Sequence, residues 1–300
     1  MKQVPQDMFI CYNWMPLVAD HIMDFKEDFY KQHGVSRLHN CDTFDPLKVK
    51  HNDLIFVKTD FIVSGYFNDA ILDKLYNKFN IITGISSYQL GRDDDGAIHK
   101  ILEHPGLNKM FCVHPPDIDN EKIIPLPIGF EEKERDGGNH EVLKRCYDSR
   151  KPFSEKEDKI LLPKHNVSTN SERAKLVNYL KEMPFIETQK EQLPFEDYLN
   201  LINEYKFVIG LEGSGPDIHR NYEALLMNSV PINKKNVIKK IFDYYKIPGV
   251  FVNSWSDLND SSYKRLLTHA WESVDTKNLD DFLTVDYHME KIRSIMTNEN

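Results

Sequence analysis

The sequence predicts an α/β protein made of two Rossmann-like domains that face a central cleft. The chain has 300 residues; that is too long for one ordinary core and about right for two domains of roughly 150 residues each. Short apolar runs alternate with stretches of helical spacing, the pattern of parallel strands joined by crossover helices. A highly charged run, residues 131–158, separates two such series. We therefore expect one domain at 1–150 and another at 151–300.

In the first half, the residues at 53–57 (DLIFV) predict a buried strand, because the run is short, β-branched and aromatic and follows a polar HND. Apolar residues then recur at mostly helical spacing over 61–79. Further strands are expected at 80–85, 107–113 and 123–128. The last of these (IIPLPI) contains prolines, which place it at a sheet edge or a strand end.

The alternation resumes after the charged run. Strands are expected at 159–162, 205–211, 230–232 and 250–252, and helices at 172–182, 195–204, 217–228 and 279–296. The helix at 195–204 carries its apolar residues at positions 195, 198, 201 and 202, so we interpret that stripe as core. Ligands of such parallel sheets bind beyond the carboxyl ends of the strands.

Composition and charge exclude several function classes. There are 38 Lys+Arg and 47 Asp+Glu, and the net charge of −9 argues against bulk nucleic-acid binding. A negative net charge does not exclude a local basic pocket for a small phosphate ligand. No stretch reaches the ~18 apolar residues of a membrane helix, and the N-terminus lacks a signal-peptide pattern, so we expect a cytoplasmic protein. The 4 cysteines form no CxxC pair, which disfavours a zinc knuckle and a disulfide scaffold.

The most informative segment is 207–232, FVIGLEGSGPDIHRNYEALLMNSVPI. A strand leads into a glycine turn and a helix that carries His219 and Glu223 on one face, with Arg220 near it. Glycine-turn amides at a helix N-terminus attract anions, and arginine offers phosphate a fixed fork. Glu223 suits ribose hydroxyls. The segment predicts a nucleoside diphosphate ligand; the alternative is a solvated β–α turn, since it matches neither GxGxxG nor GxxxxGK[ST].

The pattern G-S-G-x-D-x-H-R-x-x-E-A-L-x-x-x-S-V-P-I at 213–232 resembles the donor-binding motif of exostosin-like glycosyltransferases of the GT-B class. LLPKHNVSTNSER at 161–173 is similar to that family's opening strand and loop of the second domain. VKTDF, IITGISSY and LPIGFE are similar to strand ends of its first domain. The size looks most like the stand-alone enzymes of large algal (chlorella) viruses and bacteria.

The resemblance implies transfer of a sugar from a nucleotide-sugar donor to a glycan hydroxyl, with inversion and without a metal or another cofactor. UDP is the expected nucleotide and xylose the expected sugar. Glu223 would hold the ribose, and Arg220 and His219 would lie against the diphosphate. The implied donor-binding residues are Lys164, Asn166, Ser168, Thr169, Arg173, Glu212, Gly213, Ser214, Gly215, Asp217, His219, Arg220 and Glu223. In this fold the last helix tends to cross back onto the first domain, and we expect 279–296 to do so.

An inverting transfer needs a base that takes the acceptor proton. Asp60 follows a strand of the first domain directly, where catalytic groups collect; the alternative is that it caps the next helix. The triplet Asp93–Asp95 offers Asp94 or Asp95 as a base instead, or a Mg²⁺ or Mn²⁺ site, or a solvated acidic loop. Ser86-Ser87-Tyr88, where the family pattern favours an acidic or amide residue, offers only hydroxyls.

Sugars stack on aromatic rings, so an acceptor site could use aromatic residues in or near loops, although core packing is the competing role. Those residues are Tyr12, Trp14, Tyr66, Tyr88 and Trp255. Three rival functions stay open: a nucleotide-sugar-binding module without turnover, a metal-dependent transferase that uses Asp93–Asp95, and a structural α/β protein.

Overall fold

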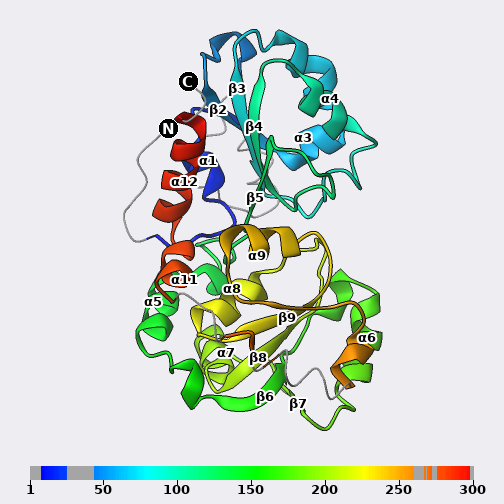
Figure 1. Ribbon diagram of the computed structural model, residues 1–300, viewed down its shortest axis with the longest axis vertical. Coiled ribbons are helices and arrows are strands. Elements are labelled where there is room, and N and C mark those ends of the chain that lie inside the picture. The colour runs from blue at the N-terminus through cyan, green and yellow to red at the C-terminus, as the bar shows by residue number, and fades with distance from the viewer. Residues whose placement is uncertain (1–7, 26–43, 260–266, 268, 272–275, 298–300) are drawn as a thin grey trace. The chain divides into compact units, whose positions relative to one another are not determined.

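The computed structural model describes residues 8–25, 44–259, 267, 269–271 and 276–297. The chain packs as two compact units, Met1–Ile128 together with Thr284–Asn300, and Gly129–Leu283 (Figure 1). The division falls before residue 150, where the charged run was expected to separate the domains. The reason is that α5 (His140–Asp148), within that run, packs against α7 (Phe195–Ile202). Arg145 of α5 also forms two hydrogen bonds with the Glu196 carboxylate of α7.

The first unit contains a parallel sheet of five strands in chain order, β1-β2-β3-β4-β5. The strands are β1 (His21–Met23), β2 (Asp53–Lys58), β3 (Phe79–Gly84), β4 (Leu107–Val113) and β5 (Ile123–Leu126). The helices are α1 (Met15–Val18), α3 (Thr59–Val63), α4 (Ala97–Glu103) and α12 (Val285–Thr297). The helical pattern over 61–79 is interrupted at Gly65 (φ +77°), after which the chain forms a π turn, Phe67–Ile71, and a 3-10 turn, Leu72–Lys74.

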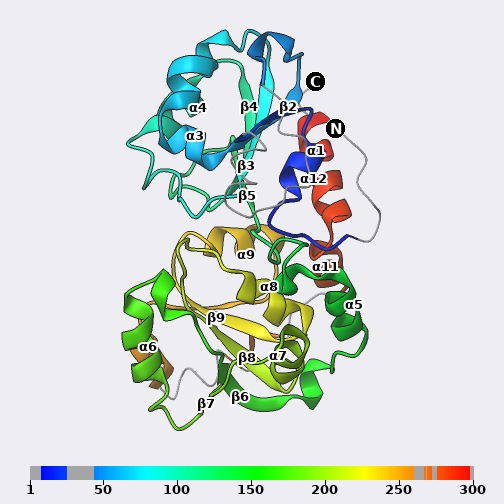
Figure 2. The same ribbon diagram turned by 180° about the vertical axis from the view of Figure 1, so that it is seen from behind.

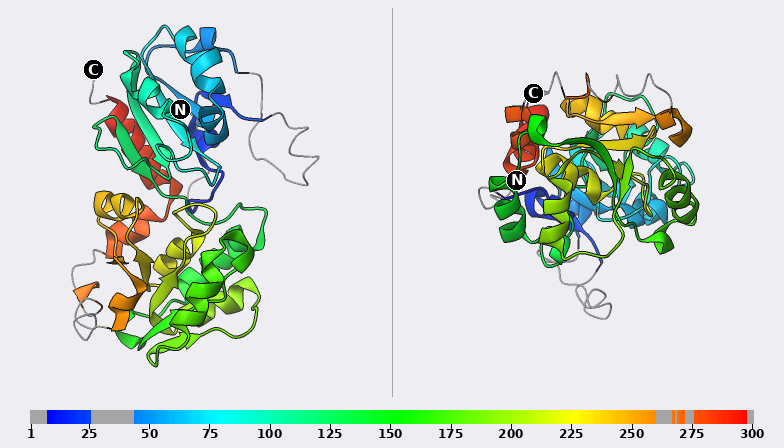
Figure 3. Two further views of the ribbon diagram at one scale, coloured as in Figure 1. Left: turned by 90° about the vertical axis from the view of Figure 1, so that its right-hand side faces the viewer. Right: turned by 90° about the horizontal axis from the view of Figure 1, so that it is seen from below.

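Two layers of helices cover this sheet. Ile55, Ile81 and Met110 from successive strands pack with Ile62 and Ile98 of α3 and α4. On the other side lie α1 and α12 (Figure 2), and Figure 3 shows α12 from the side. Burying each such aliphatic side chain contributes about 1.5–3 kcal/mol.

The helix α12, which was expected to return to the first domain, contacts residues of the first unit. Its start is joined to the N-terminal segment by the Val285 amide, which donates to the Met8 carbonyl. The rings of Trp14 and His288 lie 5.8 Å apart. Met296 accepts a hydrogen bond from the Asn52 side chain at 3.0 Å. The last helix therefore forms part of the first unit, although more than a hundred residues of sequence separate it from the strands of that unit.

The second unit contains a parallel sheet in the order β10-β9-β8-β6-β7. Its strands are β6 (Glu157–Leu162), β7 (Ile186–Thr188), β8 (Tyr205–Gly210), β9 (Val230–Lys234) and β10 (Val250–Val252). Its other helices are α6 (Glu172–Leu180), α8 (His219–Leu226), α9 (Lys239–Tyr245) and α11 (Thr276–Phe282). Two parallel, helix-covered sheets confirm the predicted α/β class.

The strand order reverses direction between β6 and β8. The chain steps outward from β6 to β7, returns past β6 to β8, and then continues through β9 to β10. Right-handed crossovers place α6 on one face of the sheet and the later helices on the other. The loops that leave β6 and β8 therefore separate, and the crevice between them is where open α/β sheets bind ligands. No helix in the described part of the chain is long and apolar enough to cross a membrane.

Candidate functional site

The segments expected to bind a donor lie together at the strand-order reversal of the second unit. One segment is the loop after β6, with the turn Val167–Thr169, and the other runs from the end of β8 into α8. Both leave the carboxyl ends of adjacent strands, because β6 pairs with β8. Sequence spacing predicted each loop, and the strand pairing brings them side by side.

Arg173, at the start of α6, ties these two loops together. Its Nε donates to the Glu212 carbonyl at 2.7 Å, and Nη2 donates to the Leu211 carbonyl at 2.7 Å. Its Nη1 donates to the Asn166 carbonyl at 2.9 Å and to Thr169 Oγ1 at 2.8 Å. Burial, with a smaller contribution from the nearby Arg220 charge, lowers the pKa of Arg173 to about 10. Four of its five N–H groups are thus used inside the fold.

Gly213 leaves room for this guanidinium. A Cβ at residue 213 would lie 3.2 Å from Arg173 Nη2, which is a tight contact. The glycine turn after β8 therefore packs closely against Arg173, and its main chain is fixed by that side chain. Ser214, the next residue, is exposed, and Gly215 is partly so.

Arg220 and Glu223, both on α8, are joined through the hydroxyl of Tyr198 on α7. Arg220 Nε donates to Tyr198 Oη at 2.8 Å, and that hydroxyl donates to Glu223 Oε2 at 2.9 Å. Arg220 Nη2 also donates to the Lys164 carbonyl at 3.3 Å. Tyr198 is buried, and that burial raises the pKa of its phenol well above the ordinary value.

The two ends of this chain of hydrogen bonds keep polar atoms without a protein partner. Within the described residues, neither Arg220 Nη1 nor Glu223 Oε1 has a hydrogen bond. Glu223 is largely buried, with 8% of its surface exposed, and Arg220 is partly buried. The exposed Lys164 ammonium likewise has no ion pair among the described side chains. A cation with a fixed fork and a carboxylate one turn further along α8 are therefore available to a ligand at this edge.

Other residues of the expected donor set shape the loops. Asn166 Oδ1 accepts hydrogen bonds from the amide of Ser168 at 3.0 Å and from its hydroxyl at 2.7 Å. The Glu212 carboxylate accepts from Asn236, after β9, at 2.7 Å. His219 Nδ1 donates to the Gly129 carbonyl at 2.8 Å. These contacts hold the loops around the strand-order reversal.

Asp217 is buried beneath the start of α8. Its Oδ1 accepts from the Ile218 amide at 2.9 Å and from Asn221 Nδ2 at 3.1 Å, and its Oδ2 accepts from the Tyr222 hydroxyl at 2.5 Å. The carboxylate fixes the first turn of α8, which carries Arg220.

Two residues of this site went unnoticed in the sequence. Tyr198 belongs to the apolar stripe of its helix, so its ring was interpreted as core; a buried tyrosine hydroxyl nevertheless needs a partner. His165 is buried between the loops, where Nδ1 donates to the Pro163 carbonyl at 2.6 Å and Nε2 accepts from the Leu211 amide at 3.4 Å. Burial, followed by the charges of Arg220 and Arg173, holds the pKa of His165 well below its ordinary value.

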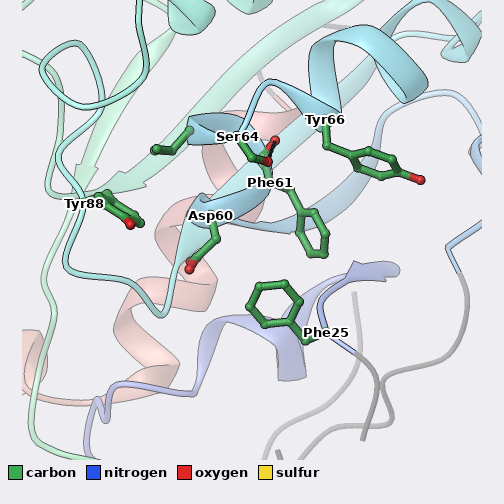
Figure 4. Close-up of a pocket in the computed structure, with 7 residues that line it drawn as sticks. Phe25, Asp60, Phe61, Ser64, Tyr66 and Tyr88 are labelled. Carbon is green, nitrogen blue, oxygen red and sulfur yellow. Dashed lines mark hydrogen bonds between the residues drawn. The ribbon is translucent and has the colours of Figure 1, made fainter. Parts of the chain in front are cut away.

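The first unit has a pocket of about 450 Å³ beyond the carboxyl ends of β2 and β3 (Figure 4). Its lining residues are Phe25, Asp60, Phe61, Val63, Ser64, Tyr66 and Tyr88. Tyr66 and Tyr88, two of the aromatic residues proposed for an acceptor site, remain 52% and 43% exposed. Trp14 and Trp255 are buried in the cores instead. An open pocket with aromatic walls and one carboxylate suits a sugar, whose apolar face stacks on rings.

Asp60 is the charged group of this pocket. Its Oδ2 lies 3.0 Å from Lys58 Nζ, and Lys58 also donates to the Ile85 carbonyl. The capping alternative for Asp60 is wrong, because α3 begins at Thr59 and no side chain caps it. Ile85 has φ +55°, a left-handed conformation that is strained for a β-branched residue and is found mostly at functional sites.

The triplet Asp93–Asp95 lies outside this pocket and is used by its own loop. Asp93 accepts from the Gln89 amide at 2.7 Å and pairs with Arg92 through two bonds, and the Arg92 bond lowers the pKa of Asp93. Asp94 is 2% exposed and accepts from the Gly91 and Gly96 amides at 3.0 and 3.1 Å. Asp95 has φ +45°. The described residues contain no group of three or more acidic, His or Cys side chains arranged to hold a metal.

Comparisons with known proteins give structural likenesses only. No protein-family model matches the chain, and no curated protein sequence matches it. Among solved structures, the chain is similar to an α,α-trehalose-phosphate synthase (UDP-forming) from Burkholderia vietnamiensis, with a TM-score of 0.38, 9% identity, and coverage of 84% of this chain and 73% of that one. It is also similar to UDP-GlcNAc 2-epimerase from Methanocaldococcus jannaschii, with a TM-score of 0.34, 13% identity, and coverage of 82% and 77%. At these scores the fold assignment rests on the strand orders described above.

Proposed function

We propose that the protein is a glycosyltransferase that moves a sugar from a nucleotide-sugar donor to a hydroxyl of a glycan. The donor is assigned to the strand-order reversal of the second unit and the acceptor to the Asp60 pocket of the first. On the resemblance of residues 213–232 to exostosin-like GT-B enzymes, we further propose a UDP-linked donor, with xylose as the first sugar to test.

One observation carries this proposal: a fixed arginine and a glutamate keep polar atoms without a hydrogen bond to any described residue, Arg220 Nη1 and Glu223 Oε1, at the carboxyl edge of the second sheet. The arginine fork suits the oxygens of a diphosphate. The carboxylate only accepts hydrogen bonds, which suits a pair of ribose hydroxyls and disfavours a phosphate. Lys164, exposed on the neighbouring loop, adds a second cation. The set therefore fits a nucleoside diphosphate better than a neutral metabolite.

The proposed chemistry is a single displacement at the anomeric carbon. The acceptor oxygen forms the new bond to that carbon while the bond to the diphosphate oxygen breaks, which inverts the configuration. Asp60 takes the proton of the acceptor hydroxyl as general base. The diphosphate leaves with increased charge, and Arg220 and Lys164 stabilise that charge. The products are the glycoside and a nucleoside diphosphate.

Metal independence is also proposed. The carboxylates of Asp93 and Asp94, which a metal-dependent enzyme would use, bond the backbone amides of their own loop instead. Those bonds use part of the acceptor capacity of both carboxylates. Protein cations at the donor edge supply the charge that a metal would otherwise provide.

A donor-turnover assay tests this function. The protein is incubated with UDP-xylose, UDP-glucose, UDP-GlcNAc or GDP-mannose, with magnesium or EDTA, and nucleoside diphosphate release is measured by chromatography with and without a glycan mixture. We expect one donor to be turned over in EDTA, faster with glycan, and Asp60→Asn to abolish that increase. Nucleotide binding with no release from any donor would overturn transfer in favour of a binding module. Release only with magnesium would overturn metal independence.

A further inference from the structure

We propose that Tyr198 is a positioning residue that keeps Arg220 and Glu223 apart, so that both remain open to the donor. The inference rests on the proposed function and deepens it. Arg220 and Glu223 stand three residues apart on α8, a spacing that makes their side chains neighbours on the helix surface and allows a direct ion pair. The structure shows no ion pair between these two side chains. Each bonds the Tyr198 hydroxyl instead, at 2.8 and 2.9 Å.

The hydroxyl can serve both neighbours because it donates once and accepts from the other side. Its proton goes to the Glu223 carboxylate, so its lone pairs face Arg220 Nε. This arrangement occupies one N–H of Arg220 and one oxygen of Glu223. It leaves Nη1 and Oε1 without a hydrogen bond to any described side chain.

Tyr198 is itself held firmly. Its side chain is 8% exposed, and the Arg220 guanidinium lies 5.5 Å from the centre of its ring. It comes from α7, which packs against α8, so its hydroxyl is placed by a separate element. Without that hydroxyl, Arg220 and Glu223 are free to pair directly. A direct pair would use the atoms that the diphosphate and the ribose need.

Removal of the Tyr198 hydroxyl should therefore affect stability and donor binding differently. Removing the hydroxyl costs little stability, because the two charged groups gain each other as partners. The same change blocks both halves of the donor site at once. A residue with a purely structural role would show the reverse, with lower stability and unchanged affinity per folded molecule.

The test measures binding of three probes by isothermal titration calorimetry, with melting temperatures in parallel. UDP reports on the whole site, inorganic pyrophosphate on the Arg220 half, and uridine on the Glu223 half. For Tyr198→Phe we expect a loss of about tenfold or more in affinity for UDP, the size of one charge-assisted hydrogen bond. Weaker binding of pyrophosphate and uridine should accompany it. The melting temperature without ligand should be kept or raised.

A double variant and a matched control make the mechanism falsifiable. Tyr198→Phe with Glu223→Gln removes the carboxylate charge, so Arg220 is released and pyrophosphate binding should recover while uridine binding does not. Tyr205→Phe, at the buried start of β8, should leave all three affinities unchanged.

Three results would overturn the inference. One is wild-type affinity for UDP in Tyr198→Phe, and another is a double variant that fails to recover pyrophosphate. In either case the wild type still binds, so the proposed function survives. If the wild type binds neither UDP nor pyrophosphate, the proposed donor site is wrong and the inference fails with it.

Discussion

Two arginines that were both expected to bind the donor, Arg173 and Arg220, have different uses in the structure. Arg173 donates four hydrogen bonds, to three carbonyls and one hydroxyl of the surrounding loops. Arg220 donates two hydrogen bonds, to the Tyr198 hydroxyl and the Lys164 carbonyl. Because the pKa of each guanidinium stays well above neutral pH, both arginines keep their charge. Arg173 uses most of its N–H groups within the fold, whereas Arg220 keeps some of them for a ligand. We therefore expect Arg173 to matter for stability and Arg220 for binding.

Replacing Arg173 tests that division. Lysine lacks the planar fork, so Arg173→Lys should leave several loop carbonyls unbonded, at a cost of about 1–3 kcal/mol. The melting temperature should fall by several degrees. Arg220→Lys is the matched control. Its free energy of unfolding should lie within about 1 kcal/mol of the wild-type value, yet its affinity for UDP should be lower. If Arg220→Lys were the destabilised variant and Arg173→Lys lost only affinity, the assignment would be reversed.

The role of Asp60 as the general base is tested by comparing Asp60→Asn with a control substitution at Asp69. Asp60→Asn keeps the shape of the pocket but removes the base, so transfer should fall by about 10²–10⁴-fold while nucleotide affinity is unchanged. Asp69→Asn, an exposed aspartate a few residues later, should retain wild-type turnover. Turnover would be measured with the donor that the release assay selects. An active Asp60→Asn together with an inactive Asp94→Asn would move the base to the 93–95 loop.

The residue types of the candidate site were readable from the sequence, but their partners were not. The glycine turn and the Arg220–Glu223 spacing depend on neighbours within one segment, so they can be predicted. The bond between Tyr198 and Glu223 joins two helices whose contact depends on packing. The internal use of Arg173 and Asp94 likewise depends on where loop carbonyls and amides end up, which residue spacing does not reveal.

Among the elements, strands with a continuous apolar run were predicted, including the short β10 at Val250–Val252, whereas β1 and β7 were not. The strands β2, β3, β8 and β9 are continuous buried runs, and their expected positions are confirmed. The strands β1 (HIM) and β7 (IET) have 3 residues each and include polar residues, so they lack the apolar run that marks β10 (VFV). Gly65 was a visible break signal within 61–79, and the structure interrupts the helix there. The order of β6 between β7 and β8 depends on long-range pairing.

The helix α5 makes stability depend on pH. His140 begins this helix, and burial, with a smaller effect from Lys133, lowers its pKa to about 4. The unfolded chain has an ordinary histidine pKa near 6.5. Between these values the unfolded state binds a proton that the folded state does not, so stability falls as pH decreases from about 6.5 to 4. The slope is up to about 1.4 kcal/mol per pH unit for this residue.

Urea unfolding at pH 7.5 and pH 5.0 measures this effect. The wild type should be less stable at pH 5.0, and His140→Gln should show a smaller difference between the two pH values. His165, whose pKa is also lowered, contributes in the same direction, so some dependence should remain in that variant. An identical pH dependence in His140→Gln and the wild type would contradict the assignment.

At the scale of the whole molecule, the two units have different sheet topologies, and the difference explains their proposed roles. The first sheet runs in simple chain order, whereas the second reverses direction between β6 and β8. Among the described strands, only those of the second sheet reverse their order, so the loops that leave β6 and β8 diverge. Lys164 lies on the first of these loops, and Arg220 lies on α8, which follows the second. In a chain with a net charge of −9, we propose that Arg220 and Lys164 form a local site for an anion. The first unit contributes aromatic walls and Asp60.

The most direct test of the account is thermal stability of the wild type and Glu223→Ala against UDP, GDP, CMP and ATP, each with magnesium and with EDTA. A ligand present at a hundred times its dissociation constant stabilises the folded state by ~2.7 kcal/mol, a readily measured shift. We predict that one nucleoside diphosphate raises the melting temperature of the wild type equally in magnesium and EDTA, and does so much less in Glu223→Ala. The absence of a shift with every nucleotide, or an equal shift in both proteins, would contradict the donor site at Arg220 and Glu223.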